Sequence, residues 1–560
     1  MARHPDWLAR LRSGLGLLLV WLAACQPLPA TPDSRPTGLP TAASSPAPTV
    51  TAAPARVVLV YYPTPAISGD VLTFDARIEL PPDAPHPLTA TLALPTGPGD
   101  VAVGTWALGS HLGARWLWAW DTSGYRGAIP ITMTLTWPEE ATPPEPLTTV
   151  ITVTLAEAST RPAYERQARW LQTETSGVRL HYLSGSAAER DLDVLRDMAQ
   201  AAYLTISGNL GVTLTTPVDI YLMDRVYGQG GYATADWVAI TYTDRNYAPA
   251  QLDLVLRHEL THRLDTALGC DQALTLVREG LAVYLSGGHY RREPDTFLLS
   301  SLRAEALYLP LETLTQDFYS HQHEISYLEA ASLVAFVDTV HGRVGLRTFC
   351  VATAPQEDRD ERARLAAGAQ ALGYRDIQEL EQAWWAWAEK EPPDPRTGLA
   401  LRVETALLDT MRAYQQAYDP VAYYLTGVLY DPQAAEARGL TTDFLRAPQS
   451  AEAITLELLL KQGVQAFESG HLERAARLTD EVQHVLAQGF PASGLAADVL
   501  ALVRASQAEG YLPYAVTATG AGRYVLQATR WENWPRRVLL LAESTPTGWR
   551  LSFFIGLDQP

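Results

Sequence analysis

The sequence predicts a multidomain α+β protein, with an N-terminal β-sandwich, a central α+β domain and a C-terminal helical region that ends in a small β-meander. Short apolar runs broken by Pro, Gly and Asp fill residues 56–158, whereas helical periodicity dominates residues 392–509. Strand-like runs return over residues 510–560. The chain has 560 residues, 47% of them apolar, which allows a substantial core and about three or four domains.

Residues 1–25 have the architecture of a signal peptide. A basic start precedes an apolar run from Leu15 to Leu22, which is too short to span a membrane. The run ends in Leu22-Ala23-Ala24-Cys25, which resembles a bacterial lipobox, in which the cysteine becomes the acylated first residue. This resemblance implies export and a lipid anchor at Cys25 on the outer face of a bacterial membrane, at the cell surface or in the periplasm. An ordinary secretory signal is the alternative.

The next two segments are a tether and a β-rich module. Residues 26–55 are almost entirely Pro, Ala, Thr and Ser, which is typical of an extended tether. Residues 56–158 are interpreted as an immunoglobulin-like β-sandwich without a cysteine pair, which suits a spacer or binding module. Its strand-like runs are Val57 to Tyr61, Val71 to Ile78, Leu88 to Leu94, Ile129 to Trp137 and Thr148 to Leu155.

The most informative motif is His258-Glu259-Leu260-Thr261-His262, which fits the HExxH pattern. On an α-helix, residues four apart lie on one face, so both imidazoles can bind one metal ion. Zinc in a catalytic site takes three protein ligands and keeps one position open for water. Glu279, in the stretch Arg278-Glu279-Gly280-Leu281-Ala282, is the candidate third ligand.

The sequence around the motif predicts two antiparallel helices. An apolar-periodic run begins after Pro249, and Gly269 is placed as its C-terminal stop. Asp271 suits an N-cap for a second helix from Ala273 to Leu285, which Ser286-Gly287-Gly288 ends. A short connection can therefore bring Glu279 to the histidine pair. The alternatives are an accidental motif on an exposed helix and a degenerate site without metal.

These residues also carry a family resemblance. His258 to His262, followed by Arg278-Glu279-Gly280-Leu281-Ala282-Val283-Tyr284, resembles the gluzincin metallopeptidases, specifically the peptidase MA-like domains. The resemblance extends over about residues 160–391, so residues 159–391 are interpreted as this domain. It includes a strand at residues 176–182, a helix from Ala187 to Ile206, a strand from Val218 to Leu222, and helices at Tyr327 to Gly342 and Trp384 to Trp387.

The resemblance implies one Zn²⁺ per chain, held by His258, His262 and Glu279, with Glu259 as the general base for hydrolysis of a peptide or protein. Tyr327 is the candidate donor of a hydrogen bond to the oxyanion, with a core-packing tyrosine as the equal alternative. The stretch from Gly231 to Ile240 is the candidate sheet edge for pairing with an extended peptide.

Composition limits the compartment and the partners. Apart from Cys25, the chain has only Cys270 and Cys350, which in an exported protein form either a disulfide or two free buried thiols. The net charge of −19 argues against nucleic acid as a partner and against membrane binding through a basic patch. We expect no membrane-spanning helix, because no other segment approaches 18 apolar residues.

The C-terminal part is predicted from periodicity alone. Residues 392–509 are interpreted as a helical bundle, in which Gly463 to Ala476 resembles a single tetratricopeptide-type hairpin. Residues 510–560 are interpreted as an antiparallel meander. Its predicted strands are Tyr514 to Thr519, Tyr524 to Trp531, Arg537 to Leu541 and Trp549 to Ile555.

Three further features have ordinary structural interpretations. The segment from His321 to Glu324 is read as a surface loop rather than a second metal cluster, and Trp384 to Trp387 as core packing rather than a sugar platform. Asp265 lies one turn beyond His262 and is a weaker candidate partner for a ligating imidazole.

Two functions remain open on sequence alone. The first is a membrane-tethered extracytoplasmic zinc metallopeptidase. The second is a catalytically silent accessory or binding lipoprotein that keeps the peptidase fold. Glu259 favours the first, because metal binding alone does not require a carboxylate at that position. The sequence carries no signal for the oligomeric state.

Overall fold

In the described part of the chain, some segments mix helices with strands and others contain only helices or only strands. This confirms the predicted α+β class. The computed structural model describes residues 56–62, 64–79, 89–94, 97–99, 106–107, 114–136, 147–161, 163–225, 229–249, 251–294, 296–316, 318–356, 359–419, 422, 432–441, 444–445, 447–531, 535–546 and 548–557. The predicted signal peptide, the lipobox residue Cys25 and the tether lie outside these residues. Over the part that is described, no helix is both long and apolar enough to cross a membrane.

The N-terminal strands form two sheets. The first has the order β1 (Arg56–Tyr61), β3 (Val71–Glu79), β7 (Ala114–Asp121), β6 (Trp106–Ala107), and the second the order β2 (Ala66–Ile67), β9 (Leu147–Ala156), β8 (Gly127–Thr136), β4 (Thr89–Leu94), β5 (Gly97–Gly99). Leu72, Phe74 and Ala76 are buried at every second position of β3, as are Ile131 and Met133 in β8. The five predicted strands are present, and the immunoglobulin-like arrangement stays a prediction.

A five-stranded sheet supports the HExxH helix. Its order is β10 (Trp170–Glu174), β11 (Val178–Leu183), β12 (Val218–Met223), β14 (Trp237–Thr241), β13 (Gly231–Ala233). The three central strands are parallel, and β10 and β13 are antiparallel edge strands. The stretch predicted as one strand from Gly231 to Ile240 is therefore two strands, and its first half is the sheet edge.

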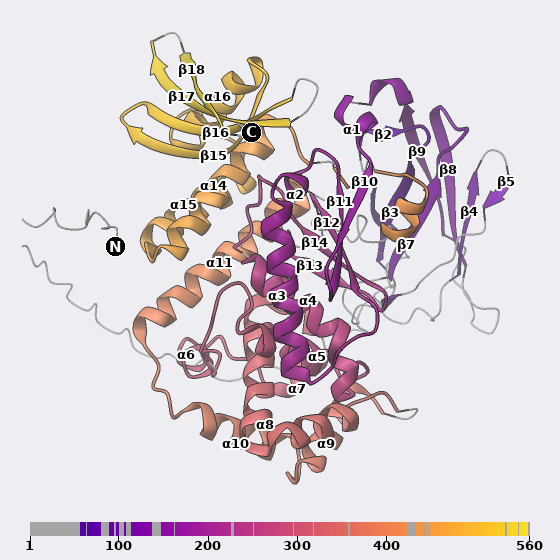
Figure 1. Cartoon of the computed structure of the whole chain (residues 1–560), viewed down its shortest axis with the longest axis vertical. Helices are drawn as coiled ribbons and strands as arrows, with labels where there is room; N and C mark the ends of the chain where they lie inside the picture. The colour runs from indigo at the N-terminus through magenta and orange to yellow at the C-terminus, as the bar shows by residue number, and fades with distance from the viewer. Residues whose placement is uncertain are drawn as a thin grey trace, which may run out of the picture. The chain divides into compact units, whose positions relative to one another are not determined.

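Both faces of this sheet are covered. Helices α3 (Leu192–Leu210) and α4 (Leu252–Leu264) pack on one face (Figure 1), where Leu256, Leu260 and Leu264 of α4 are buried in the largest apolar core. On the other face, Tyr221 and Trp237 form a smaller cluster with Ala435 and Phe444. Part of the predicted C-terminal helical region thus returns to the central sheet, and the boundaries between domains stay predictions.

Helix α4 is followed by the second predicted helix, α5 (Thr275–Ser286). The turn η3 (Asp265–Leu268) extends α4 and ends at Gly269, whose φ of 69° is the left-handed conformation expected at the predicted stop. The predicted N-cap at Asp271 is wrong, because the chain first makes a turn in which the Ala273 N–H donates to the Cys270 carbonyl. Leu274 then precedes the helix without a side-chain cap.

Helix α5 packs against the long helix α8 (His323–Ala352). A Cβ atom on Gly280 would lie 2.3 Å from the Ala330 carbonyl oxygen, so only glycine permits this close approach. The helix that carries Glu279 is thereby held between α4 and α8. The other helices of this part are η1 (Ala158–Thr160), α1 (Ala163–Gln167), α2 (Ala187–Arg190), α6 (Leu299–Ala304), α7 (Leu311–Gln316), η4 (Phe318–Ser320), α9 (Glu361–Ala371) and α10 (Ile377–Ala388).

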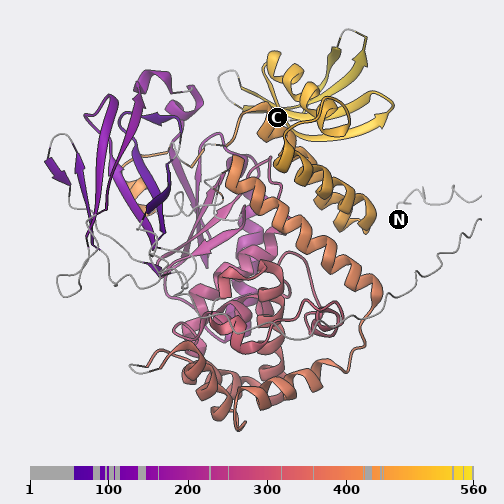
Figure 2. The ribbon, with the colours of Figure 1, turned by 180° about the vertical axis from the view of Figure 1, so that it is seen from behind.

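The C-terminal part contains helices and a meander. The described helices are α11 (Pro395–Tyr418), α13 (Pro432–Ala437), α14 (Ala451–Glu468), α15 (Leu472–Gln488) and α16 (Leu495–Ala508), and the strands are β15 (Tyr511–Gly520), β16 (Arg523–Trp531), β17 (Pro535–Thr545) and β18 (Gly548–Gly556). The four strands pair antiparallel in chain order, which confirms the predicted meander. Strand β15 packs against α14 and α16, as Figure 2 shows in yellow and orange.

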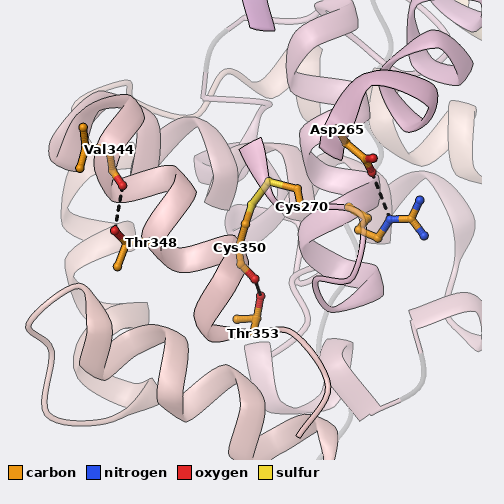
Figure 3. Close-up of a disulfide and its surroundings, with 7 residues drawn as sticks. Asp265, Cys270, Val344, Thr348, Cys350 and Thr353 are labelled. Carbon is orange, nitrogen blue, oxygen red and sulfur yellow. Dashed lines mark hydrogen bonds and ion pairs between the residues drawn. A yellow bond between two sulfur atoms is a disulfide. The ribbon is translucent and has the colours of Figure 1, made fainter. Parts of the chain in front are cut away.

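A disulfide connects the end of the α4 segment to the end of α8. Cys270 and Cys350 have an S–S distance of 2.02 Å and a Cα–Cα distance of 4.8 Å, and they close a loop of 80 residues (Figure 3). Both residues are fully buried. The bridge therefore links the segment after the HExxH helix to the part of α8 that follows the non-helical residue Gly342.

We predict that replacing both cysteines by alanine lowers the free energy of unfolding by about 2–5 kcal/mol, because the unfolded chain gains the freedom of a long loop. The measurement is urea unfolding followed by circular dichroism. A reducing agent should lower the midpoint of the wild type and leave that of the Cys270→Ala/Cys350→Ala variant unchanged. An unchanged wild-type midpoint under reducing conditions would contradict the prediction.

Candidate metal centre

Helices α4 and α5 bring three potential metal ligands to one point. The Nε2 atoms of His258 and His262 lie 3.2 Å apart. Oε2 of Glu279 lies 3.2 Å from the first nitrogen and 3.3 Å from the second. The side chains are 11–13% exposed, so the group sits just below the surface. This group can hold a metal ion.

The dimensions of this triangle fit a small tetrahedral cation. Ligand atoms bound to zinc at about 2.0–2.1 Å in tetrahedral geometry lie about 3.3 Å from one another. The three observed distances agree with that value, and two imidazoles with one carboxylate are a common donor set of catalytic zinc. Oε2 of Glu279 is buried and has no hydrogen-bond partner among the described residues, as expected for an oxygen reserved for a cation.

The second oxygen of Glu279 is held by a tyrosine. The hydroxyl of Tyr319, in η4, donates to Oε1 at 2.7 Å. Burial would raise the pKa of Glu279, but His262 and His258 together hold that pKa well below its usual range. The carboxylate is therefore ionised, and its orientation is fixed from both sides.

Glu259 lies beside the triangle and faces the sheet edge. A Cβ atom on Gly231 of β13 would come within 2.6 Å of Oε1 of Glu259, so the missing side chain leaves room for the carboxylate. Burial raises the pKa of Glu259 to about 7, with His258 opposing the rise and Glu279 adding to it. The chain thus has a buried carboxylate, separate from the three ligands, next to the edge strand of the sheet.

Tyr327 forms part of a wall of aromatic rings next to His258. Its ring stacks on His289 at 4.2 Å with an interplanar angle of 2°, and its centroid lies 6.0 Å from that of His258. Burial raises the pKa of Tyr327 well above its usual value, and the charges of Glu279 and Glu259 add to the rise. The residue is buried, as the core-packing alternative predicts, yet its phenol is close to the site.

The structure corrects one prediction next to this wall. The segment from His321 to Glu324 is not simply a surface loop, because His323 begins α8 and Glu324 is fully buried in its first turn. The ring of His323 lies 4.4 Å from that of Tyr327. The apolar faces of α8 draw the start of the helix into the core, which a short polar stretch does not reveal.

Two other sequence predictions have clear outcomes. Asp265 accepts a hydrogen bond from Arg278 Nε at 3.2 Å (Figure 3), and the Nδ1 atoms of both motif histidines have no partner among the described residues, so Asp265 does not orient His262 through a hydrogen bond. Trp384 is fully buried and donates to Ser332 Oγ at 3.0 Å, which confirms the core-packing interpretation for that residue.

Tyr319 and His289 were not predicted from the sequence. Tyr319 stands on a single short turn, where no periodicity marks it. His289 directly follows the glycines that end α5, and its position after the helix stop was the available signal. Its Nδ1 lies 2.6 Å from Oε2 of Glu324, and burial lowers its pKa well below the usual value, so the ring is neutral.

The chain was compared with protein families, curated proteins and solved structures. No protein-family model and no curated protein matches the chain. Among solved structures, a protein of the aminopeptidase N family from Idiomarina loihiensis is similar over 60% of this chain and 74% of that chain, with 9% identity and a TM-score of 0.22. Similarity at this level establishes neither a shared fold nor shared chemistry, so the residues of this chain alone support the function proposed for it.

Proposed function

We propose that the chain is a zinc-dependent metallopeptidase. The observation that carries the proposal is the triangle of His258, His262 and Glu279, with donor atoms 3.2–3.3 Å apart and the carboxylate of Glu259 beside it. A protein that only binds the metal ion needs only these three ligands. A hydrolase also needs a base next to the metal, and Glu259 supplies it.

A zinc ion held by His258, His262 and Glu279 would lower the pKa of a water molecule and polarise the scissile carbonyl. Glu259 accepts the proton of the attacking water on its carboxylate and transfers it to the leaving amine. Edge strand β13 offers its backbone to an extended peptide beside Glu259. The phenol of Tyr327, which its raised pKa keeps protonated, donates a hydrogen bond to the oxyanion.

We predict that the purified protein contains about one zinc ion per chain and cleaves general protease substrates. Glu259→Gln should keep the zinc and lower kcat by about 10²–10⁴-fold, because it removes the base and not a ligand. Gly231→Ala should show the same pattern more weakly, since the added methyl group displaces the carboxylate. Metal content by mass spectrometry and fluorogenic peptide hydrolysis measure both effects.

Two results would contradict the proposal. The first is wild-type protein without stoichiometric zinc after purification in metal-replete buffer. The second is Glu259→Gln protein as active as the wild type. Stoichiometric zinc with no hydrolysis of any peptide would instead favour the accessory lipoprotein.

Two tyrosine variants should separate metal binding from turnover. We predict that Tyr319→Phe weakens zinc affinity by about 10–100-fold, because the ligand Glu279 loses its hydrogen-bond donor. Tyr327→Phe should keep the zinc affinity and lower kcat by about 10²–10³-fold with little change in KM. Competition with a zinc chelator measures the first effect, and steady-state kinetics the second. An unchanged kcat for Tyr327→Phe would show that this tyrosine packs in the core and takes no part in catalysis.

We further propose that the enzyme is exported and anchored by a lipid on Cys25. The lipobox pattern supports this, and a disulfide such as Cys270–Cys350 is typical of oxidising compartments. In a bacterial host, the wild type should sediment with membranes and incorporate a labelled fatty acid, whereas Cys25→Ser should do neither. Membrane sedimentation of Cys25→Ser would contradict the anchor.

A further inference from the structure

Three glutamates lie together beneath the wall that His289 and Tyr327 form. Glu293 follows α5, Glu324 is in the first turn of α8, and Glu404 is in α11. One oxygen of each lies within 4.8 Å of the others. The side chains are 4%, 0% and 1% exposed, respectively. We call these three residues the glutamate cluster.

The charges of the glutamate cluster are not balanced by the side chains around it. Arg291 donates from Nε to Glu293 Oε1 at 2.7 Å and lies 3.0 Å from Glu404 Oε2 through its terminal nitrogen. His289, which contacts Glu324, is neutral because burial lowers its pKa. With all three carboxylates ionised, the single guanidinium would leave a net charge of −2. Such a charge is costly to bury without a partner.

Two oxygens of the cluster also lack hydrogen-bond donors. Oε1 of Glu324 and Oε1 of Glu404 are buried and have no partner among the described residues. Both belong to side chains that are at least 99% buried. Buried carboxylate oxygens are normally satisfied by N–H or O–H groups, so unsatisfied oxygens in a buried cluster of three glutamates favour a bound cation.

We propose that Glu293, Glu324 and Glu404 bind a divalent cation, and that this cation is calcium. The donors are all carboxylate oxygens, which suit hard cations, in contrast to the two imidazoles of the proposed zinc site. Calcium accepts such oxygens at about 2.3–2.6 Å in flexible geometry, so oxygens within 4.8 Å of one another can share one ion. Two positive charges neutralise the net charge of −2.

Protons are the competing occupants of the cluster. Burial raises the pKa of Glu293 to about 7 and that of Glu324 to about 8, so without a cation the cluster takes up protons near neutral pH. Calcium binding must then release protons, which gives a signal that a surface calcium site of ionised carboxylates would not give.

The site would act on the metal centre through His289. Glu324 holds the Nδ1 of His289, and the ring of His289 stacks on Tyr327 and lies 6.1 Å from the ring of His258. The cluster also joins α11, a helix of the C-terminal part, to α8 and to the segment after α5. A bound calcium ion would therefore fix one wall of the proposed active site.

The test uses the full-length protein, stripped of metals on a chelating resin and reloaded with one equivalent of zinc. Calcium chloride is the probe, in equilibrium dialysis and thermal unfolding. We expect one calcium ion per chain with a Kd at or below about 1 mM, a rise in Tm, and proton release in weakly buffered solution. Glu404→Gln and Glu293→Gln should each weaken calcium binding at least about tenfold, because each removes one charged ligand.

Glu329→Gln is the matched control. Glu329 is fully buried in the same helix as Glu324, but its Oε1 accepts the N–H of Leu309 at 2.9 Å outside the cluster. This variant should bind calcium like the wild type. Zinc content near one per chain in every variant shows that the fold is intact. No calcium binding by zinc-loaded wild type at about 10 mM, or equal weakening in Glu329→Gln, would overturn the proposal and leave protons as the occupants.

Discussion

The close approach of α4, α5 and α8 is the constraint on which the candidate metal centre depends. Helix α4 is held by leucines buried against the sheet, and α5 approaches α8 so closely that Gly280 admits no side chain. Glu279 precedes Gly280 in the chain, so the packing that requires the glycine also fixes the third donor. The disulfide from Cys270 to Cys350 adds a covalent link between the segment after α4 and the part of α8 beyond Gly342. Three donor atoms within 3.3 Å of one another are the result.

Two neighbouring glutamates acquire opposite properties from their surroundings. Glu279 faces two imidazoles and a tyrosine hydroxyl, which keep its pKa low. Glu259 is buried against Gly231, and among the nearby charges only His258 opposes the effect of burial, so its pKa rises. Carboxylates whose environments push their pKa values apart are suited to different tasks, here the proposed ligand and the proposed base. The two carboxylates differ because Glu259 lies on α4 and Glu279 on α5, so each has different neighbours.

Residues of the candidate metal centre could be predicted from the sequence where their positions depend on local periodicity. Residues that reach the centre through tertiary contacts could not. His258, Glu259 and His262 follow from helical spacing, and Glu279 follows from two predicted helices with a short connection. Tyr319 and His289 lie on short irregular segments. They reach the site through tertiary contacts, of Tyr319 with Glu279 and of His289 with Tyr327, which no local pattern encodes.

The same distinction applies to the fold. The meander was predictable from strand-like runs and turn residues, whereas two strands of the central sheet were expected only from the family resemblance, and their parallel pairing was not predicted. Strand β7 is absent from the predicted runs, although Trp116, Trp118 and Trp120 recur at the period of a strand. The return of Ala435 and Phe444 to the central sheet, like the contact of Glu404 with Glu324, joins segments far apart in the chain. Such contacts follow from packing between elements and have no signature in composition.

The central claim is that one metal ion is bound by side chains from two helices. X-ray absorption spectroscopy at the zinc edge of the purified protein tests it most directly. We predict a four-coordinate ion at about 2.0–2.1 Å with the scattering pattern of two imidazoles and oxygen ligands, and an altered first shell in Glu279→Ala. A first shell without imidazole scattering, or one unchanged when His258 and His262 are both replaced by alanine, would contradict it.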